Sequence, residues 1–309
     1  MARRRRGRPV NGILVLDKPL GDSSNYALQQ AKRLYFAAKA GHTGSLDPLA
    51  TGVLPVCFGE ATKFSQYLLD ADKVYEATFV LGTQTDTGDA EGEVIGQQDA
   101  SSLTREMVAV ALEEFVGTIE QVPSMYSAIK HDGQPLYKLA RKGIEVDRKA
   151  RTITITSLEM LAFREGESAE VDIRLACSKG TYVRSLAEDL GAALGCGAHV
   201  SALRRTAAGP FTLEDSVSLA TLEALKGADK LAAMDELLKP ADTAVGGLPL
   251  VRLTESGGYY LRQGQPVMVP NAPCDGIVRV ALETGEFLGV GEILDDGRVA
   301  PRRLIVTGG

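Results

Sequence analysis

The sequence predicts an α+β protein: a large domain with a mixed β-sheet and flanking helices, followed by a small β-rich module. The chain has 309 residues, of which 44% are hydrophobic and 24% are charged, so one sizeable core and a second, smaller one are expected. Strand-like and helix-like patterns are interspersed as far as residue 244. The segment 245–249, Val-Gly-Gly-Leu-Pro, then marks a boundary, and short β runs with glycine turns fill residues 250–309.

Strands are expected where apolar residues run together or alternate with polar ones. The clearest alternation lies in residues 73–81, where Tyr75, Ala77 and Phe79 share one face of an extended chain. Other strands are expected at residues 12–16, 53–58, 152–163, 169–177 and 200–205, and in the last module at 277–282, 287–293 and 304–306.

Helices are expected where apolar residues recur at helical spacing. Ser23 or Ser24 caps a helix that runs to about residue 38. The helix expected at residues 181–194 gathers its apolar residues on one side, with Arg184 pointing elsewhere. The other helices are expected at residues 61–69, 103–116 and 219–238. Polar or irregular surface segments are expected at residues 83–93 and 123–151.

Composition excludes several classes of protein. No apolar run approaches the roughly 20 residues of a membrane-spanning helix, and the basic residues 1–10 lack the apolar segment of a signal peptide. We expect those ten residues to form a disordered tail, either solubilising or an arm for phosphates. The four cysteines are scattered without a Cys-x-x-Cys pair, and the three histidines do not complete a zinc set. We therefore expect a reduced, cytoplasmic protein with no metal.

Charge leaves the partner open. The formal net charge of −6, taken alone, argues against a nucleic-acid partner. Basic residues nevertheless cluster at the N-terminus, within residues 141–151, and again at Lys179, Arg184, Arg204 and Arg205. A basic groove on an acidic body is compatible with this pattern.

The most informative stretch is residues 41–52, Gly-His-Thr-Gly-Ser-Leu-Asp-Pro-Leu-Ala-Thr-Gly. Its three glycines and proline exclude a helix or a central strand, and apolar runs flank it, so we expect a rigid loop. At its centre lies Asp47, which Pro48 holds in an extended conformation. A turn in which the aspartate bonds its own backbone is the plainer interpretation. The histidine and three hydroxyl residues of the loop favour a functional site.

Three familiar kinds of site do not fit these residues. The segment 41–45 lacks the Gly-Lys-Ser/Thr ending of a phosphate loop, and the acidic segment 86–92 has the wrong spacing for a calcium loop. A Ser-His-Asp hydrolase would need a nucleophile-elbow pattern, which is missing around Ser45. A single fixed carboxylate suits attack at a sugar carbon or deprotonation, whereas a glycosidase normally shows a carboxylate pair.

Residues 41–52 resemble the catalytic signature of the TruB family of tRNA pseudouridine-55 synthases. Further blocks resemble the family in the same order at residues 11–19, 23–25, 59–64, 73–75, 86–89, 123–128, 177–184, 195–200 and 203–205. The resemblance implies a pseudouridine synthase catalytic domain at residues 11–244 and a PUA-like RNA-binding domain at 245–309. It implies isomerisation of the T-loop uridine of tRNA, position 55, to pseudouridine, without a cofactor.

The resemblance also implies roles for individual residues. Asp47 matches the catalytic aspartate, Arg184 its arginine partner, and Asp89 an acidic residue that helps to hold this arginine. Tyr75 matches the active-site tyrosine, suited to stack on the flipped uracil and to take the C5 proton. His42 matches the residue that fills the gap left by the extruded base. What Asp47 attacks, C1′ or C6 or the 2′ proton, stays open.

Other matching positions concern the pocket and the RNA backbone. Tyr182 and Leu203 match residues that line the uracil pocket, and Lys18 is expected behind the Tyr75 ring. From the residues alone, Tyr75 and Leu203 would be plain core positions. The expected backbone contacts are Lys63, Lys130, Arg141, Lys142, Arg148, Lys149 and Arg151, mostly within an RNA-binding insertion at about residues 124–151. A solvated charged face is the alternative for each of these cations.

The expected partner is the T-arm and elbow of tRNA, bound by a monomer with no obligate protein partner and no membrane. One rival function is an RNA-binding chaperone that folds the tRNA elbow with little or no dependence on catalysis. A second rival is an RNA-guided relative that works inside a ribonucleoprotein. The insertion at 123–151 and the short last module favour the stand-alone enzyme.

Overall fold

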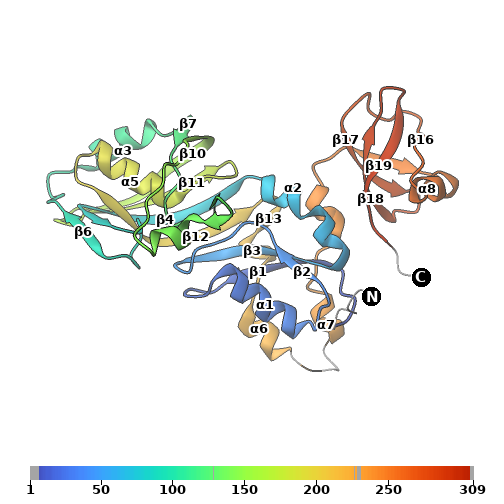
Figure 1. Cartoon of the computed structure of the whole chain (residues 1–309), viewed down its shortest axis with the longest axis horizontal. Helices are drawn as coiled ribbons and strands as arrows, with labels where there is room; N and C mark the ends of the chain where they lie inside the picture. The colour runs from blue at the N-terminus through green and yellow to red at the C-terminus, as the bar shows by residue number, and fades with distance from the viewer. Residues whose placement is uncertain (1–6, 128, 226, 228–230, 307–309) are drawn as a thin grey trace.

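The structure is a computed structural model, which describes residues 7–127, 129–225, 227 and 231–306 (Figure 1). A large mixed sheet has the strand order β14-β1-β3-β12-β4-β11-β10-β7, with β2 added to β3 and β13 added to β12. Its strands are β1 (Gly12–Lys18), β2 (Ala40–His42), β3 (Ala50–Phe58), β4 (Lys73–Leu81), β7 (Gly117–Gln121), β10 (Arg151–Arg164), β11 (Glu170–Cys177), β12 (Ala198–Ala208), β13 (Phe211–Thr212) and β14 (Val217–Ser218).

Helices cover the two halves of this sheet. They are α1 (Ser24–Leu34), α2 (Ser65–Asp70), α3 (Arg105–Glu113), α4 (Leu136–Ala140), α5 (Val183–Ala193), α6 (Leu219–Ala224) and α7 (Leu231–Asp235), with 3-10 turns at Gly59–Phe64, Leu213–Asp215 and Ala241–Val245. Apolar residues of α3 and α5 pack on β4, β10 and β11, and those of α1, α6 and α7 pack on β1 and β3. The predicted α+β class is confirmed.

The centre of the sheet positions the candidate site. Strand β12 runs parallel to β3 and antiparallel to β4, so it joins the half that begins the chain to the half that follows. Leu203 of β12 pairs with Ala50 of β3 on one side and with Ala77 of β4 on the other. The loop between β2 and β3, which carries Asp47, therefore emerges beside the start of β4.

Several expected elements differ from the structure. Helix α1 ends at Leu34 and not near residue 38, because Phe36 takes a left-handed conformation with φ of 47°. The segment 83–93 begins with a strand, β5 (Thr83–Thr85), which pairs with β6 (Val94–Gln97). The expected helix at 219–238 is two short helices, and part of the intervening chain lies outside the described residues.

The stretch 41–52 is less loop-like than predicted. Its two ends belong to strands, with Gly41 in β2 and Gly52 in the central strand β3. A Cβ atom at Gly52 would lie 2.2 Å from the carbonyl oxygen of Arg205, and the glycine has φ of 101°. Glycine is therefore present because β12 approaches the backbone of β3 too closely for a side chain, and not because the chain turns there. Only residues 43–49 form the loop.

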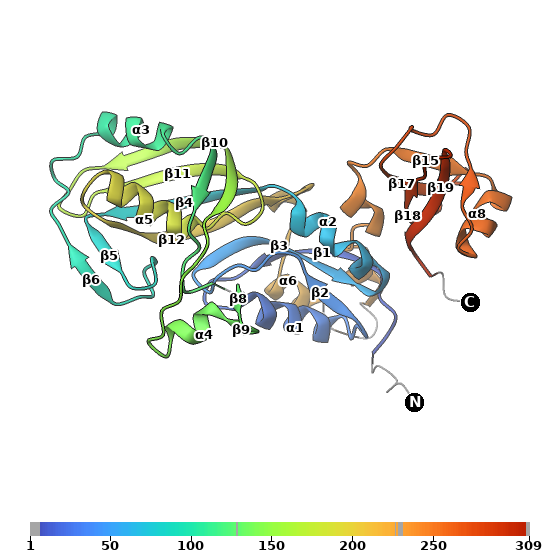
Figure 2. The same ribbon diagram turned by 45° about the horizontal axis from the view of Figure 1, so that its top comes forward.

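The smaller domain is a five-stranded sheet in the order β15-β17-β18-β19-β16, and it stands apart from the large sheet in both views (Figures 1 and 2). Its elements are β15 (Leu250–Leu253), α8 (Glu255–Arg262), β16 (Val267–Met268), β17 (Ile277–Leu282), β18 (Phe287–Ile293) and β19 (Arg298–Leu304). Helix α8 was not predicted. The domain meets the large one where the rings of Phe64 and Phe287 lie 5.3 Å apart.

Residues 8–10 of the expected disordered tail belong to the folded domain, contrary to the prediction. Residues 1–6 of the expected tail lie outside the described residues. Arg8 instead belongs to the folded domain: its guanidinium lies 2.6 Å from Asp235 and donates a hydrogen bond of 2.8 Å to the Tyr35 carbonyl. Val10 is buried. Among the described residues, no helix is long and apolar enough to cross a membrane.

Candidate active site

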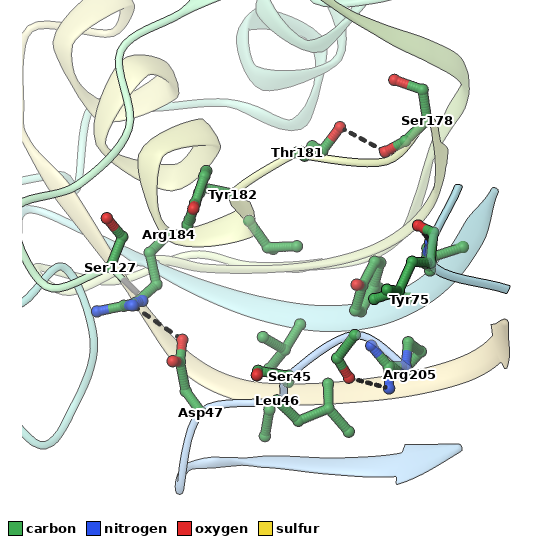
Figure 3. A pocket seen from close by; sticks show the side chains of 17 residues that line it. Ser45, Leu46, Asp47, Tyr75, Ser127, Ser178, Thr181, Tyr182, Arg184 and Arg205 are labelled. Carbon is green, nitrogen blue, oxygen red and sulfur yellow. Dashed lines mark hydrogen bonds and ion pairs between the residues drawn. The ribbon is translucent and has the colours of Figure 1, made fainter. Parts of the chain in front are cut away.

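A cavity of about 330 Å³ opens where the 43–49 loop, the start of β4, the start of α5 and β12 converge (Figure 3). Asp47 and Arg184 lie at one end of the cavity, and Tyr75 and Arg205 lie at the other. Tyr182 also lines it. Segments that are far apart in the sequence thus contribute to one site, and Ser127 of the 124–151 segment also lines it.

The Asp47 carboxylate forms an ion pair of 2.9 Å with the Arg184 guanidinium. The arginine side chain is 6% exposed, whereas the aspartate side chain is 44% exposed and faces the cavity. Two further bonds fix the guanidinium: it donates to the carbonyls of Thr87 at 3.0 Å and Tyr126 at 2.9 Å. A buried, fully oriented cation therefore holds a carboxylate that is still accessible from the cavity.

Asp89 supports the same arginine from the far side. Its carboxylate lies 3.4 Å from the Arg184 guanidinium and its side chain is 5% exposed. The Thr87 hydroxyl and the Glu91 backbone N–H donate to it at 2.6 and 3.1 Å. Asp89 lines a second cavity of about 630 Å³, which shares Asp47 and Arg184 with the first. One cation is thus placed between two carboxylates, of which only Asp47 lines the smaller cavity.

Burial and charge act in opposite directions on Asp47. Burial raises the pKa of its carboxyl group above the ordinary value, and the Arg184 guanidinium opposes this rise. Burial also raises the pKa of the Tyr75 phenol, and the nearby Arg205 cation opposes that rise. For Asp47 and Tyr75 alike, a neighbouring arginine therefore opposes the effect of burial on the pKa.

The 43–49 loop is held by hydrogen bonds from outside it. The Ser24 hydroxyl donates to the Leu46 carbonyl at 3.0 Å and accepts from the Leu46 N–H at 2.7 Å. The Thr43 N–H donates to the Pro55 carbonyl at 3.0 Å. The Gly21 N–H donates to the Pro48 carbonyl at 2.9 Å. These bonds fix the backbone on both sides of Asp47, as the sequence predicts for a rigid loop.

Lys18, which is expected behind the Tyr75 ring, is engaged with backbone carbonyls in the structure. Its ammonium group donates to the carbonyls of Pro19, Asp22 and Pro48, at 2.8, 2.6 and 3.4 Å. The side chain is completely buried and is not among the residues that line either site cavity. Its three donors are used by backbone carbonyls, so Lys18 ties the turn after β1 to the 43–49 loop.

The other expected pocket residues lie at the cavities. Tyr75, Tyr182 and Leu203 are half-buried and line the smaller one. The backbone of Tyr182 is fixed by Gln121, which accepts from its N–H at 2.8 Å and donates to its carbonyl at 3.1 Å. His42 lines the larger cavity, its Nδ1 has no hydrogen-bond partner among the described residues, and burial lowers the pKa of its imidazole.

The expected RNA-contacting cations of the insertion are exposed or partly engaged with neighbouring groups. Exposed side chains on or next to the insertion are those of Lys130, Lys142, Lys149 and Arg151. Arg141 lies over the Tyr137 ring at 5.6 Å, and Arg148 donates to the Pro123 carbonyl at 3.1 Å. Figure 2 shows this insertion, with β8 (Lys130–His131), β9 (Gln134–Pro135) and α4, extending from the large sheet towards α1.

Lys63 does not fit the expected role of a phosphate contact. Its ammonium group forms an ion pair of 2.6 Å with Glu60 and donates to the carbonyl of Leu304 at 2.8 Å. The same glutamate accepts from the Val306 N–H at 2.7 Å. Lys63 and Glu60 therefore connect the large domain to the smaller one. The sequence could not show this contact, because the partners are separated by more than 200 residues.

Sequence reasoning placed Arg205 and Lys73 within family-like blocks but assigned neither cation to the site, although both are buried at the cavity. Arg205 is 1% exposed, and Lys73 is 6% exposed. Both line the cavity beside Tyr75. A signal was available for Lys73, which lies two residues before Tyr75 on the same face of an alternating strand. Among the described residues no group of His, Cys, Asp and Glu is arranged to hold a metal ion.

Family models match nearly the whole chain. Residues 32–183 match the TruB family pseudouridylate synthase N-terminal domain, residues 184–246 a tRNA pseudouridylate synthase B C-terminal domain, and residues 249–305 the pseudouridine synthase II TruB C-terminal model. The chain is 55% identical to a tRNA pseudouridine synthase B of Saccharophagus degradans over 98% of each chain. It is 58% identical to that of Stutzerimonas stutzeri over 96% of each.

Solved structures of similar fold belong to larger assemblies. A chain of an H/ACA RNP bound to a substrate RNA containing 2′-deoxyuridine aligns with a TM-score of 0.74 and 25% identity, over 99% of this chain and 92% of that one. A chain of a Cbf5–Nop10–Gar1 complex aligns with a TM-score of 0.72 and 27% identity, over 100% and 90%. The sequence matches, in register over the whole length, show that this chain belongs to the TruB family of pseudouridylate synthases.

Proposed function

We propose that the protein is a stand-alone tRNA pseudouridine-55 synthase, which isomerises the T-loop uridine of tRNA to pseudouridine. The observation that carries the proposal is an accessible carboxylate, Asp47, held by a buried arginine at the mouth of a cavity of nucleoside size. The relatives at 55–58% identity carry the name tRNA pseudouridine synthase B, whereas the ribonucleoprotein chains are only 25–27% identical. This difference favours the stand-alone enzyme.

The proposed reaction needs a nucleotide that has left its stack. A uridine in a folded T-loop must be extruded to reach a cavity in a protein, which costs a few kcal/mol of unstacking. The cavity would hold the uracil between Tyr75, Tyr182 and Leu203, and His42 in the adjoining cavity would fill the gap left in the RNA. The C1′–N1 bond then breaks, the uracil turns, C5 bonds to C1′, and the C5 proton leaves.

Each polar residue of the site has a proposed role in these steps. Asp47 acts on the extruded nucleotide as the ionised carboxylate, and Arg184 orients it and favours its ionised form. Asp89 keeps the guanidinium of Arg184 in place. Tyr75 would stack on the uracil and would take the C5 proton as the phenolate, the form that the Arg205 cation favours. No metal, cofactor or energy source is part of the proposal, because the isomerisation involves no redox change and no hydrolysis.

The RNA would be gripped outside the cavity. The cations proposed to contact its backbone are Lys130, Arg141, Lys142, Arg148, Lys149 and Arg151. We propose residues 11–244 as the catalytic domain and residues 245–309 as a PUA-like RNA-binding domain. We also propose a cytoplasmic monomer, because one chain completes the site and all four cysteines are free thiols.

The test compares wild type with Asp47→Asn on an unmodified tRNA transcript, without added metal or nucleotide. Pseudouridine is mapped by carbodiimide treatment and primer extension, and tRNA affinity is measured by filter binding. Wild type should give a stop at the T-loop uridine, and Asp47→Asn should give none while binding tRNA within about threefold of wild type. Normal modification by Asp47→Asn would refute the role of the aspartate. Tight binding without modification by either protein would instead favour the RNA-folding chaperone.

A further inference from the structure

The end of the cavity opposite Asp47 carries two buried cations that have no carboxylate partner. Arg205 is the largest of the fully buried side chains, and it forms no ion pair among the described residues. Within the described part of the chain, the Lys73 ammonium group likewise donates hydrogen bonds only to backbone carbonyls, those of Leu68, Leu69 and Ala71. Burying a cation without a counter-charge is costly, so two of them beside one cavity require an explanation.

The position of Arg205 is set by strand register. On β12 it pairs directly with Tyr75 of β4, and on the other side with Gly52 of β3. Its guanidinium donates to the Val53 carbonyl at 2.7 Å and the Gly44 carbonyl at 3.1 Å. Its positive charge also acts on the Tyr75 phenol, whose pKa it lowers against the effect of burial. Figure 3 shows Arg205 and Tyr75 together at one end of the cavity, across from Asp47 and Arg184.

The two ends of the cavity therefore differ in charge. At one end, Arg184 is balanced by the carboxylates of Asp47 and Asp89. At the other end, neither Arg205 nor Lys73 forms an ion pair with a described residue, and Asp70 and Asp72 act on Lys73 only from a greater distance. Burial lowers the pKa of Lys73 to about 8, and the charge of Arg205 is the next largest cause of this shift. The same charge also lowers the pKa of His42. A ligand in the cavity therefore meets a negative electrostatic potential near Asp47 and a positive one near Arg205.

We infer that Arg205, assisted by Lys73, stabilises negative charge on the uracil. The uracil carries this charge while it is detached from the ribose, or while it is activated for detachment. The inference rests on the proposed function. When the C1′–N1 bond breaks heterolytically, the bonding pair stays on the uracil and is delocalised over N1, O2 and O4. Addition of the carboxylate to C6 would place the same charge on O4. The pair returns when C5 bonds to C1′; the C5 proton then leaves and N1 is protonated.

Preorganised positive charge aimed at developing negative charge is a large source of catalysis in a water-poor site. The cations would be costly in the resting enzyme and would become balanced only when the uracil is anionic, which is a preference for the transition state over the bound uridine. A purely structural role predicts something different. The carbonyls of Val53 and Gly44 need hydrogen-bond donors and not a charge. Glutamine keeps a donor at the position of Nε for Val53 and loses the one for Gly44, so a structural role predicts the same fold-loss on every substrate.

The experiment uses full-length protein and two tRNA substrates under single-turnover conditions. One carries uridine and the other a single 5-fluorouridine at the target position, since fluorine withdraws electrons and stabilises negative charge on the ring by itself. Loss of the target nucleoside is followed by nuclease digestion and mass spectrometry. The variants are Arg205→Gln and Arg205→Lys. Arg204→Gln is the matched control. Arg204 directly precedes Arg205, but its guanidinium forms an ion pair of 2.8 Å with Asp17 and not with a group at the Tyr75 end.

For uridine, Arg205→Gln should slow conversion about 100-fold with little change in tRNA affinity, the size expected for removing one charge-stabilising donor. For 5-fluorouridine the loss should be tenfold or less, and Arg205→Lys should retain more activity than Arg205→Gln. Arg204→Gln should match wild type on both substrates. Should Arg205→Gln not fold, Lys73→Met takes its place, with a smaller loss on uridine that again shrinks on 5-fluorouridine.

Two failures are distinguishable. In the first, wild type converts uridine and the Arg205 or Lys73 variants lose the same factor on both substrates. This result would overturn the charge role and leave the proposed function intact. Wild type that converts neither substrate would overturn the proposed function itself.

Discussion

Replacing Arg184 with methionine should move the acid limb of the pH–rate profile to higher pH. In the proposed mechanism Asp47 acts as the ionised carboxylate. Burial raises the pKa of its carboxyl group, and Arg184 is the largest influence opposing that rise. Loss of an opposite charge at 2.9 Å should raise this pKa by roughly 1–3 units. A higher pKa leaves less ionised carboxylate at a given acidic or neutral pH. The variant should therefore be most defective at low pH and recover part of its rate as pH rises.

The assay is single-turnover conversion of tRNA by wild type, Arg184→Met and Arg184→Lys between pH 5 and about pH 9. Arg184→Lys keeps a positive charge but lacks the planar fork, so its acid limb should shift less than that of Arg184→Met. The methionine variant should also lose about 3–5 kcal/mol of stability, because a buried ion pair loses one partner while Asp89 stays buried. A rate loss that is the same factor at every pH would refute the electrostatic argument and leave Arg184 with a purely orienting role.

Two further predictions follow from the fold and the surface. Removing the exposed charges of Lys149 and Arg151 together should reduce the slope of log Kd against log salt concentration for tRNA by about 1–2. Lys63→Ala should leave this slope unchanged, because the ammonium group of Lys63 is engaged with Glu60. Equal effects of the two changes would contradict this division. Gly52→Ala should destabilise the protein by about 3 kcal/mol or more in denaturant unfolding, since its Cβ would lie 2.2 Å from a carbonyl oxygen, with a matching substitution at an uncrowded glycine as the control.

Local patterns in the sequence predicted the elements that local physics determines. The alternation in residues 73–81 gave β4 with its bounds, because one face of this strand is buried under α5 and the other is only half-buried. Ser23 caps α1 as expected, accepting from the Tyr26 N–H. The helix after residue 219 was less predictable. Its apolar residues also fit two short helices packed on the same core.

The candidate site was predictable only in part. Motif blocks named Asp47, Arg184 and Asp89, and the structure brings these three within ion-pair distance. Their catalytic roles stay a prediction. The partners of Lys18 and Lys63 could not be predicted, because a lysine near a motif gives no information about which carbonyls or carboxylates it meets. Those partners are fixed by contacts such as that between Lys63 and Leu304, which no local pattern encodes.

The order of strands in the sheet explains why the two ends of the cavity differ in charge. Strand β12 comes after β3 and β4 in sequence but lies between them, so the Asp47 loop and Tyr75 come together only when residues 198–208 are inserted. The bond from Arg205 to the Val53 carbonyl spans 152 residues. The placement of β12 between β3 and β4 therefore completes the pocket. The backbone of β12 fits there because Gly52 has no side chain. The strand register that forms the cavity therefore also buries Arg205 at one end of it.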